Sequence, residues 1–170
     1  LNQVNRMGLF ASYTVGDLVA RVSYVTPDQT QEDDAAGRED ELSVSFDYKV
    51  GQFSLGAGYV GNGNFVDGQD AYALTAEYAL NDTTAVGLQY INQDRIGPAD
   101  ESGVTLYGRT EFSGVGVGAF ISTTDRDSAV DDVAYGIGAS YDLGGATLAG
   151  TIQKGFDDNT YADVGVRFSF

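Results

Sequence analysis

Hydrophobic and polar residues alternate along most of this chain with a period of two. In residues 133–143 the odd positions hold Val, Tyr, Ile, Ala, Tyr and Leu, whereas the even positions hold Ala, Gly, Gly, Ser and Asp. Successive side chains of a β-strand point to opposite faces of its sheet. The alternation therefore predicts a strand with one apolar face and one face of small and polar residues.

The same alternation recurs and predicts eleven strands. They cover about residues 5–15, 18–26, 41–50, 53–61, 71–80, 84–92, 103–112, 115–123, 133–143, 146–155 and 161–170. Short turns, such as the one at Gly144-Gly145, alternate strictly with long loops. Short turns join neighbouring antiparallel strands. We therefore expect an all-β antiparallel meander.

Large aromatic or aliphatic side chains recur near both ends of the apolar strand faces. Those beside the short turns are Tyr13, Tyr48, Tyr78, Phe112 and Tyr141. Those toward the long loops are Tyr24, Tyr59, Tyr90, Ile121 and Ile152. Membrane barrels carry aromatic belts at both interfaces, and a tilted strand of about 10 residues spans their apolar band. The pattern favours a transmembrane β-barrel over the alternative, a soluble sandwich or lipocalin-like barrel.

Composition excludes several classes of function. The net charge of −16 argues against a nucleic-acid partner, because phosphate binding needs basic patches. The 170 residues include no Cys and no His, which removes the usual catalytic pairs and zinc ligands. The glycine run 114–118 lacks the Lys-Ser/Thr of a phosphate loop. We therefore expect no enzymatic activity, no cofactor and no metal site.

Three segments carry a resemblance to a known family. They are Tyr-Val-Thr-Pro-Asp-Gln-Thr at 24–30, the strand 133–143 with its Gly-Gly turn, and the C-terminal stretch 162–170. Together with the order of strands and loops, they resemble general-diffusion porins of Gram-negative bacteria, of the purple-bacterial type. The resemblance implies a homotrimer of 16-stranded barrels in the outer membrane, in contact with lipid and lipopolysaccharide. It also implies that Phe170 belongs to an assembly signal.

The number of strands indicates that this barrel is incomplete. In an antiparallel meander, the first and the eleventh strand run in the same direction. Single-chain bacterial barrels have an even number of strands, and an open edge in lipid leaves backbone groups unpaired. The chain also does not begin with Met. We therefore expect residues 1–170 to form the C-terminal eleven strands of one larger barrel domain.

The polar strand faces carry the residues that we expect to line a pore. The basic ones are Arg6, Arg21, Lys49, Arg109 and Arg167, and the acidic ones are Asp47, Glu77, Glu111, Asp142 and Asp163. Opposed basic and acidic patches would create a transverse field that favours small polar solutes. The alternative is that these charges pair across strands and are structural. Tyr107 and Gln89 are also expected on this wall, where Phe10 and Phe120 are apolar exceptions.

The long loops hold most of the negative charge. They contain 17 of the 25 acidic residues and three arginines, which gives −14 of the net −16. An acidic mouth enriches cations. The sequence thus predicts a passive diffusion channel for small hydrophilic solutes and ions with a cation preference. The alternatives are a non-conducting barrel acting as adhesin or surface scaffold, and loop acids that bridge divalent cations to lipopolysaccharide or only keep the loops solvated.

Overall fold

Eleven strands make up the regular structure of this chain. The computed structural model describes residues 7–27, 39–63, 67–94, 100–126 and 129–168. The strands are β1 (Met7–Val15), β2 (Leu18–Thr26), β3 (Glu41–Val50), β4 (Phe53–Gly61), β5 (Ala71–Ala79), β6 (Ala85–Gln93), β7 (Glu101–Phe112), β8 (Val115–Thr124), β9 (Val133–Asp142), β10 (Ala146–Lys154) and β11 (Thr160–Phe168). No helix in these described ranges is long and apolar enough to cross a bilayer.

The strand order of the sheet follows the sequence, from β1 to β11. All eleven predicted strands are present, and their ends lie within two residues of those expected, except that residues 5–6 and 169–170 of the first and last predicted strands lie outside the described residues. The prediction of an antiparallel meander is confirmed. The strands gather into two compact units. One unit is built around β1–β4 and the other around β7–β11, and β5 and β6 are divided between them.

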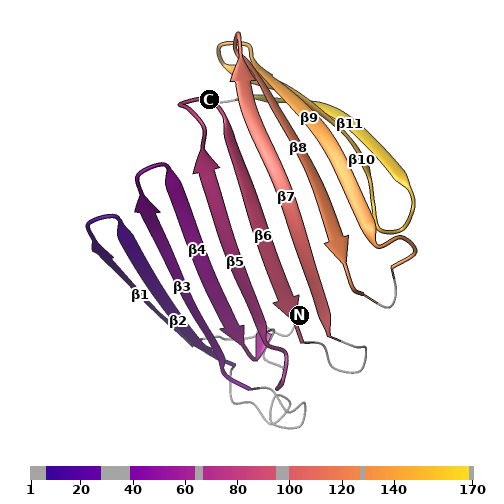
Figure 1. Cartoon of the computed structure of the whole chain (residues 1–170). Helices are drawn as coiled ribbons and strands as arrows, with labels where there is room; N and C mark the ends of the chain where they lie inside the picture. The colour runs from indigo at the N-terminus through magenta and orange to yellow at the C-terminus, as the bar shows by residue number, and fades with distance from the viewer. Residues whose placement is uncertain (1–6, 28–38, 64–66, 95–99, 127–128, 169–170) are drawn as a thin grey trace. The chain divides into compact units, whose positions relative to one another are not determined.

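The first unit consists of successive antiparallel hairpins (Figure 1). Its register places residues of like character opposite one another. Tyr24 of β2 lies opposite Leu9 of β1 and Leu42 of β3, whereas Arg21 lies opposite Ser12 and Ser45. Cross-strand neighbours on one face stabilise the sheet through their contacts. The register therefore keeps the apolar and polar faces continuous across β1 to β4.

The second unit repeats this arrangement in β7 to β11, which lie side by side in Figure 1. Ile137 of β9 lies opposite Ala119 of β8 and Ile152 of β10. On the other face, Ser140 of β9 lies opposite Gly116 and Ala149. A shift by one residue would reverse both faces, so the alternation itself fixes the register.

The short turns use residues that accept a positive φ. Gly144 and Gly145 have φ values of 76° and 137°, as predicted for this pair. Ser113 and Gly114 are both positive, at 53° and 78°, as a type I′ hairpin turn requires. The carboxylate of Asp142 accepts a hydrogen bond of 2.7 Å from the Gly144 amide, which fixes the entry to its turn.

Burial in this sheet is inverted relative to a soluble protein. Along β9 the apolar residues Tyr135 and Ile137 are 53% and 52% exposed, whereas Gly136 between them is buried. Among the described residues, the only buried hydrophobic side chains are Ala85 and Ala134. A soluble sandwich or barrel would bury its apolar face to form a core. The described part of the chain contains no such core, so the structure gives the soluble alternative no support.

Candidate channel wall

The polar strand faces carry nine of the ten residues predicted to line a pore, and the tenth, Arg6, lies outside the described residues. Arg21 of β2 and Asp47 of β3 form an ion pair. Arg21 lies opposite Ser45 in the register, so Asp47 is its diagonal neighbour on the same face. Long side chains reach such diagonal positions. The side chains are 52% and 57% exposed, so this pair lies on the surface of the polar face.

A second pair joins residues that are two strands apart. Arg109 of β7 donates a 2.7 Å hydrogen bond from Nη2 to Oε1 of Glu77 on β5. Its Nε and the hydroxyl of Tyr107 donate to the other oxygen, Oε2, at 3.4 and 3.2 Å. The Glu77 side chain is only 21% exposed, whereas that of Arg109 is 64% exposed. The acid is therefore held against the wall, and the base above it remains accessible to water.

The other predicted wall residues take separate places. Asp163 of β11 lies directly opposite Thr151 of β10 and accepts a 2.7 Å hydrogen bond from its hydroxyl. Asp142 accepts the turn hydrogen bond to Gly144 described above. In the register, Lys49 lies opposite Ser54, Glu111 opposite Gly116, and Arg167 opposite Thr147. Four of the nine described residues thus form two ion pairs, as the alternative of cross-strand pairing expects.

Small residues hollow out the polar face beside the second pair. A shallow open hollow of about 490 Å³ runs across β7 to β10. Its lining includes Arg109, Glu111, Gly116, Gly118, Ser140 and Thr151. Glycines at these positions leave space where a strand would otherwise project side chains. The hollow therefore exposes charged and hydroxyl groups to water on this face.

Phe120, an apolar exception on the polar face, is explained by its neighbour. It lies directly opposite Gly136 of β9 in the register. A Cβ atom at Gly136 would lie 2.8 Å from the ring carbon Cε1 of Phe120. The absence of a side chain at Gly136 therefore lets the ring lie flat on the neighbouring strand. The sequence alone did not explain Phe120, because only the strand register shows that a glycine lies opposite this aromatic residue.

Tyrosines at the long-loop ends of the strands bind loop carboxylates. Tyr24 donates a hydrogen bond to Asp40, and Tyr59 donates one of 2.8 Å to Asp70. Tyr161 of β11, which the sequence did not single out, donates to Asp157 in the same way. The rings of Tyr24 and Tyr59 keep their apolar bodies on the apolar strand face and their hydroxyls at a polar rim, as in membrane-interface belts, whereas Tyr161 lies opposite Gln153 on the polar face.

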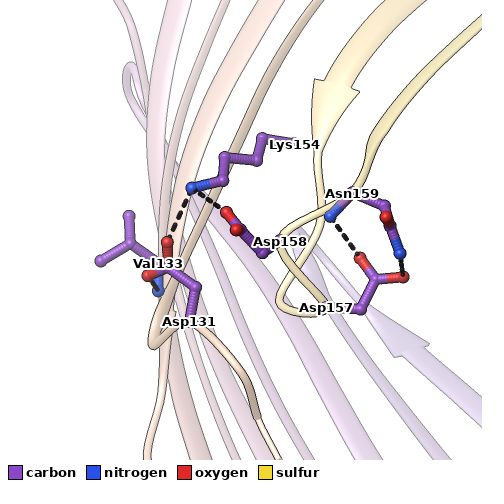
Figure 2. A network of polar contacts seen from close by, with 6 residues as sticks. All are labelled: Asp131, Val133, Lys154, Asp157, Asp158 and Asn159. Carbon is purple, nitrogen blue, oxygen red and sulfur yellow. Dashed lines mark hydrogen bonds and ion pairs between the residues drawn. The ribbon is translucent and has the colours of Figure 1, made fainter.

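Two long loops dock onto each other in the second unit. Lys154 Nζ contacts Asp131 at 2.8 Å and Asp158 at 2.6 Å, as Figure 2 shows. The backbone amides of Val130 and Asp131 both donate 2.9 Å hydrogen bonds to the carbonyl of Phe156. One lysine therefore joins the loop after β8 to the loop after β10.

Comparison with known proteins decides the family. The profile of the Gram-negative porin family matches residues 2–160. The chain belongs to the Gram-negative porin family. Porins of this family are outer-membrane proteins, which places this chain in the outer membrane.

The porin chain resembles two curated relatives. It is 36% identical to a porin of Fuscovulum blasticum over 98% of this chain and 56% of the relative, and 27% identical to a porin of Rhodobacter capsulatus over 95% and 61%. A solved triple mutant of the Rhodopseudomonas blastica porin superposes with a TM-score of 0.85, at 36% identity over 98% of this chain and 56% of that one. The chain thus spans slightly more than half the length of the relatives that it matches.

Hydrogen bonds lower the pKa of several carboxyls in the loops of this porin. The pKa of Asp157 falls to about 2, chiefly because the Tyr161 hydroxyl donates to it, with further support from Asn159. The ammonium of Lys154 lowers the pKa of Asp131. The backbone amide of Ser102, followed by its hydroxyl, lowers that of Asp125. These acids therefore stay ionised at neutral pH while they hold the loops together.

Within the described ranges, no group of three or more acidic residues is arranged to hold a metal ion. Loop carboxylates there instead accept hydrogen bonds from tyrosines, a backbone amide and Lys154. Asp125, for example, binds both the amide and the hydroxyl of Ser102, the latter at 2.7 Å. These hydrogen bonds stabilise the loops in which the acids lie.

Proposed function

We propose that the natural protein containing this chain is a passive diffusion channel for small hydrophilic solutes and ions. The observation that carries the proposal is the inverted burial of the strands: large apolar side chains are exposed on one face, and charged, hydroxyl and glycine residues occupy the other. A wall of this kind suits lipid outside and water inside. The proposal concerns the whole protein, because this chain spans slightly more than half of its relatives.

The residues that we propose to line the channel are the ten charged residues of the polar faces. Arg21 pairs with Asp47 and Arg109 pairs with Glu77, so these four add little net charge to the wall. Asp125, Asp131 and Asp157 are hydrogen-bonded and have lowered pKa values, so they remain ionised. The loop acids together account for most of the net −16. We therefore attribute a cation preference to the mouth rather than to the wall, and we expect salt to screen it.

Further support comes from a solved relative. A structure reported under the heading of asymmetric conductivity of engineered proteins superposes on this chain with a TM-score of 0.85 and 36% identity. That heading concerns conduction by the relative. We propose conduction for the protein that contains this chain as well. The proposal also includes a homotrimeric assembly and contacts to lipid and lipopolysaccharide. A catalytic role is no part of the proposal.

Planar lipid bilayers test this function. The natural protein, purified from its outer membrane, is expected to give stepwise increases of current, and reversal potentials in a salt gradient should show cation preference that weakens as salt is raised. The triple variant Glu39→Gln, Asp67→Asn, Asp100→Asn removes three exposed loop charges and should reduce that preference. Absence of current steps would contradict the channel and support the adhesin or scaffold. Anion preference at low salt would contradict the acidic mouth.

A further inference from the structure

Tyr107 lies flat on the polar face because a glycine occupies the neighbouring strand. Gly87 of β6 is buried, and a Cβ atom placed on it would lie 2.7 Å from Cε1 of Tyr107 and closer still to Cζ and the hydroxyl oxygen. Real Cβ atoms do not approach other heavy atoms this closely. Any other residue at position 87 would therefore displace the tyrosine ring.

The Tyr107 ring connects strands β7, β6 and β5 on the polar face. From β7, across Gly87 of β6, the Tyr107 hydroxyl reaches Oε2 of Glu77 on β5 at 3.2 Å. Arg109, two residues further along β7 and therefore on the same face, binds the same carboxylate at 2.7 Å. Two donors of β7, the Tyr107 hydroxyl and the Arg109 guanidinium, thus hold the Glu77 carboxylate.

We propose that Gly87 is a positioning residue that sets the bore and the local charge of the channel at this level. The inference rests on the proposed function, because it assumes that the polar face lines a water-filled pore. A side chain at Gly87 would swing the Tyr107 ring away from the wall and into the pore. It would also remove one of the donors that hold Glu77 beside Arg109.

Gly87 is a better test position than Gly136, the glycine beneath Phe120. At Gly136 a new Cβ would also meet the backbone carbonyl of Ile152 at 3.2 Å, which cannot move freely. At Gly87 the three nearest atoms all belong to the far end of the Tyr107 side chain, which can rotate. The substitution Gly87→Ala should therefore move the ring and leave the sheet intact.

The experiment uses the natural protein carrying Gly87→Ala, labelled with fluorotyrosine. Fluorine NMR should show a shifted Tyr107 resonance, assigned with Tyr107→Phe, and bilayer recordings should show a lower single-channel conductance. The double variant Gly87→Ala, Tyr107→Ala should restore at least the wild-type conductance, because the displaced ring is gone. The matched control is Gly58→Ala on the polar face of β4, where the nearest atom to a new Cβ is the Val44 carbonyl oxygen at 3.9 Å. It should change neither signal.

The outcomes separate this inference from the proposed function. An unshifted Tyr107 resonance in Gly87→Ala overturns the inference, as does a conductance that stays unchanged or that the double variant does not restore. A shifted resonance in a protein that passes no current overturns the channel and leaves the positioning of Tyr107 standing. If Gly87→Ala fails to fold but the double variant folds, the steric role of the ring is supported.

Discussion

Individual side chains on the polar face depend on their neighbours across strands more than on their own sequence surroundings. Parity along each strand predicted which face Glu77 and Arg109 occupy, and that prediction agrees with their position. It could not predict that they pair, because 32 residues separate them and β6 lies between their strands. The sequence likewise left Phe120 unexplained until the register placed it opposite Gly136.

At the residue scale, Tyr161→Phe should raise the pKa of Asp157. The tyrosine hydroxyl is the largest cause of the lowered value of about 2, so its loss should move the pKa toward the ordinary aspartate range. Because the folded-state pKa is depressed, the stability that this carboxylate contributes is present above the unfolded pKa, near 4, and is lost as pH falls through about 2. In the Tyr161→Phe variant, the stability that the Asp157 carboxylate contributes should be smaller and should be lost at a higher pH than in the unsubstituted protein. Carboxyl carbon NMR of Asp157 measures the change, and an unaltered titration would contradict the assignment.

The strands and their connections were predictable because their signals are local. A period of two and the turn residues at Gly144-Gly145 each act within a few residues. Some strand ends differ by one or two residues from those expected: β7 starts earlier, at Glu101, and β9 ends earlier, at Asp142. The docking of the loop after β8 onto the loop after β10 has no periodic signal, and the sequence did not predict it.

At the element scale, Lys154→Gln should loosen that docking. The substitution removes the charge that joins Asp131 and Asp158, although the backbone hydrogen bonds to Phe156 remain. Ion pairs that remain partly open to water are individually weak, so we expect an increase on the order of a few-fold in the rate of tryptic cleavage after Arg126. Mass spectrometry of the digest measures it. Lys49→Gln, which removes the same charge beside a short turn, is the control, and an equal rate in both variants would contradict the docking.

For the whole molecule, the inverted burial was predictable from the same alternation. Strand parity separates an apolar face from a face of glycine, hydroxyl and charge, and the large apolar side chains of the first face are exposed in the described residues. The family match agrees with the resemblance seen in the sequence. Two statements stay predictions: that residues 1–170 form one barrel domain, and that the ten charged residues face the pore. Strand parity assigns each residue to a face of the sheet, but it does not show what covers that face.

Single-cysteine substitution tests the central claim most directly, since this chain has no cysteine of its own. Ser140→Cys and Thr151→Cys place a thiol on the polar face, and their neighbours Ala139→Cys and Ile152→Cys place one on the apolar face. A charged, water-soluble thiol reagent is added during bilayer recording of each variant. We predict that the current falls for Ser140→Cys and Thr151→Cys and stays constant for the other two. Equal block at all four positions, or block only at Ala139→Cys and Ile152→Cys, would contradict a channel lined by the polar face.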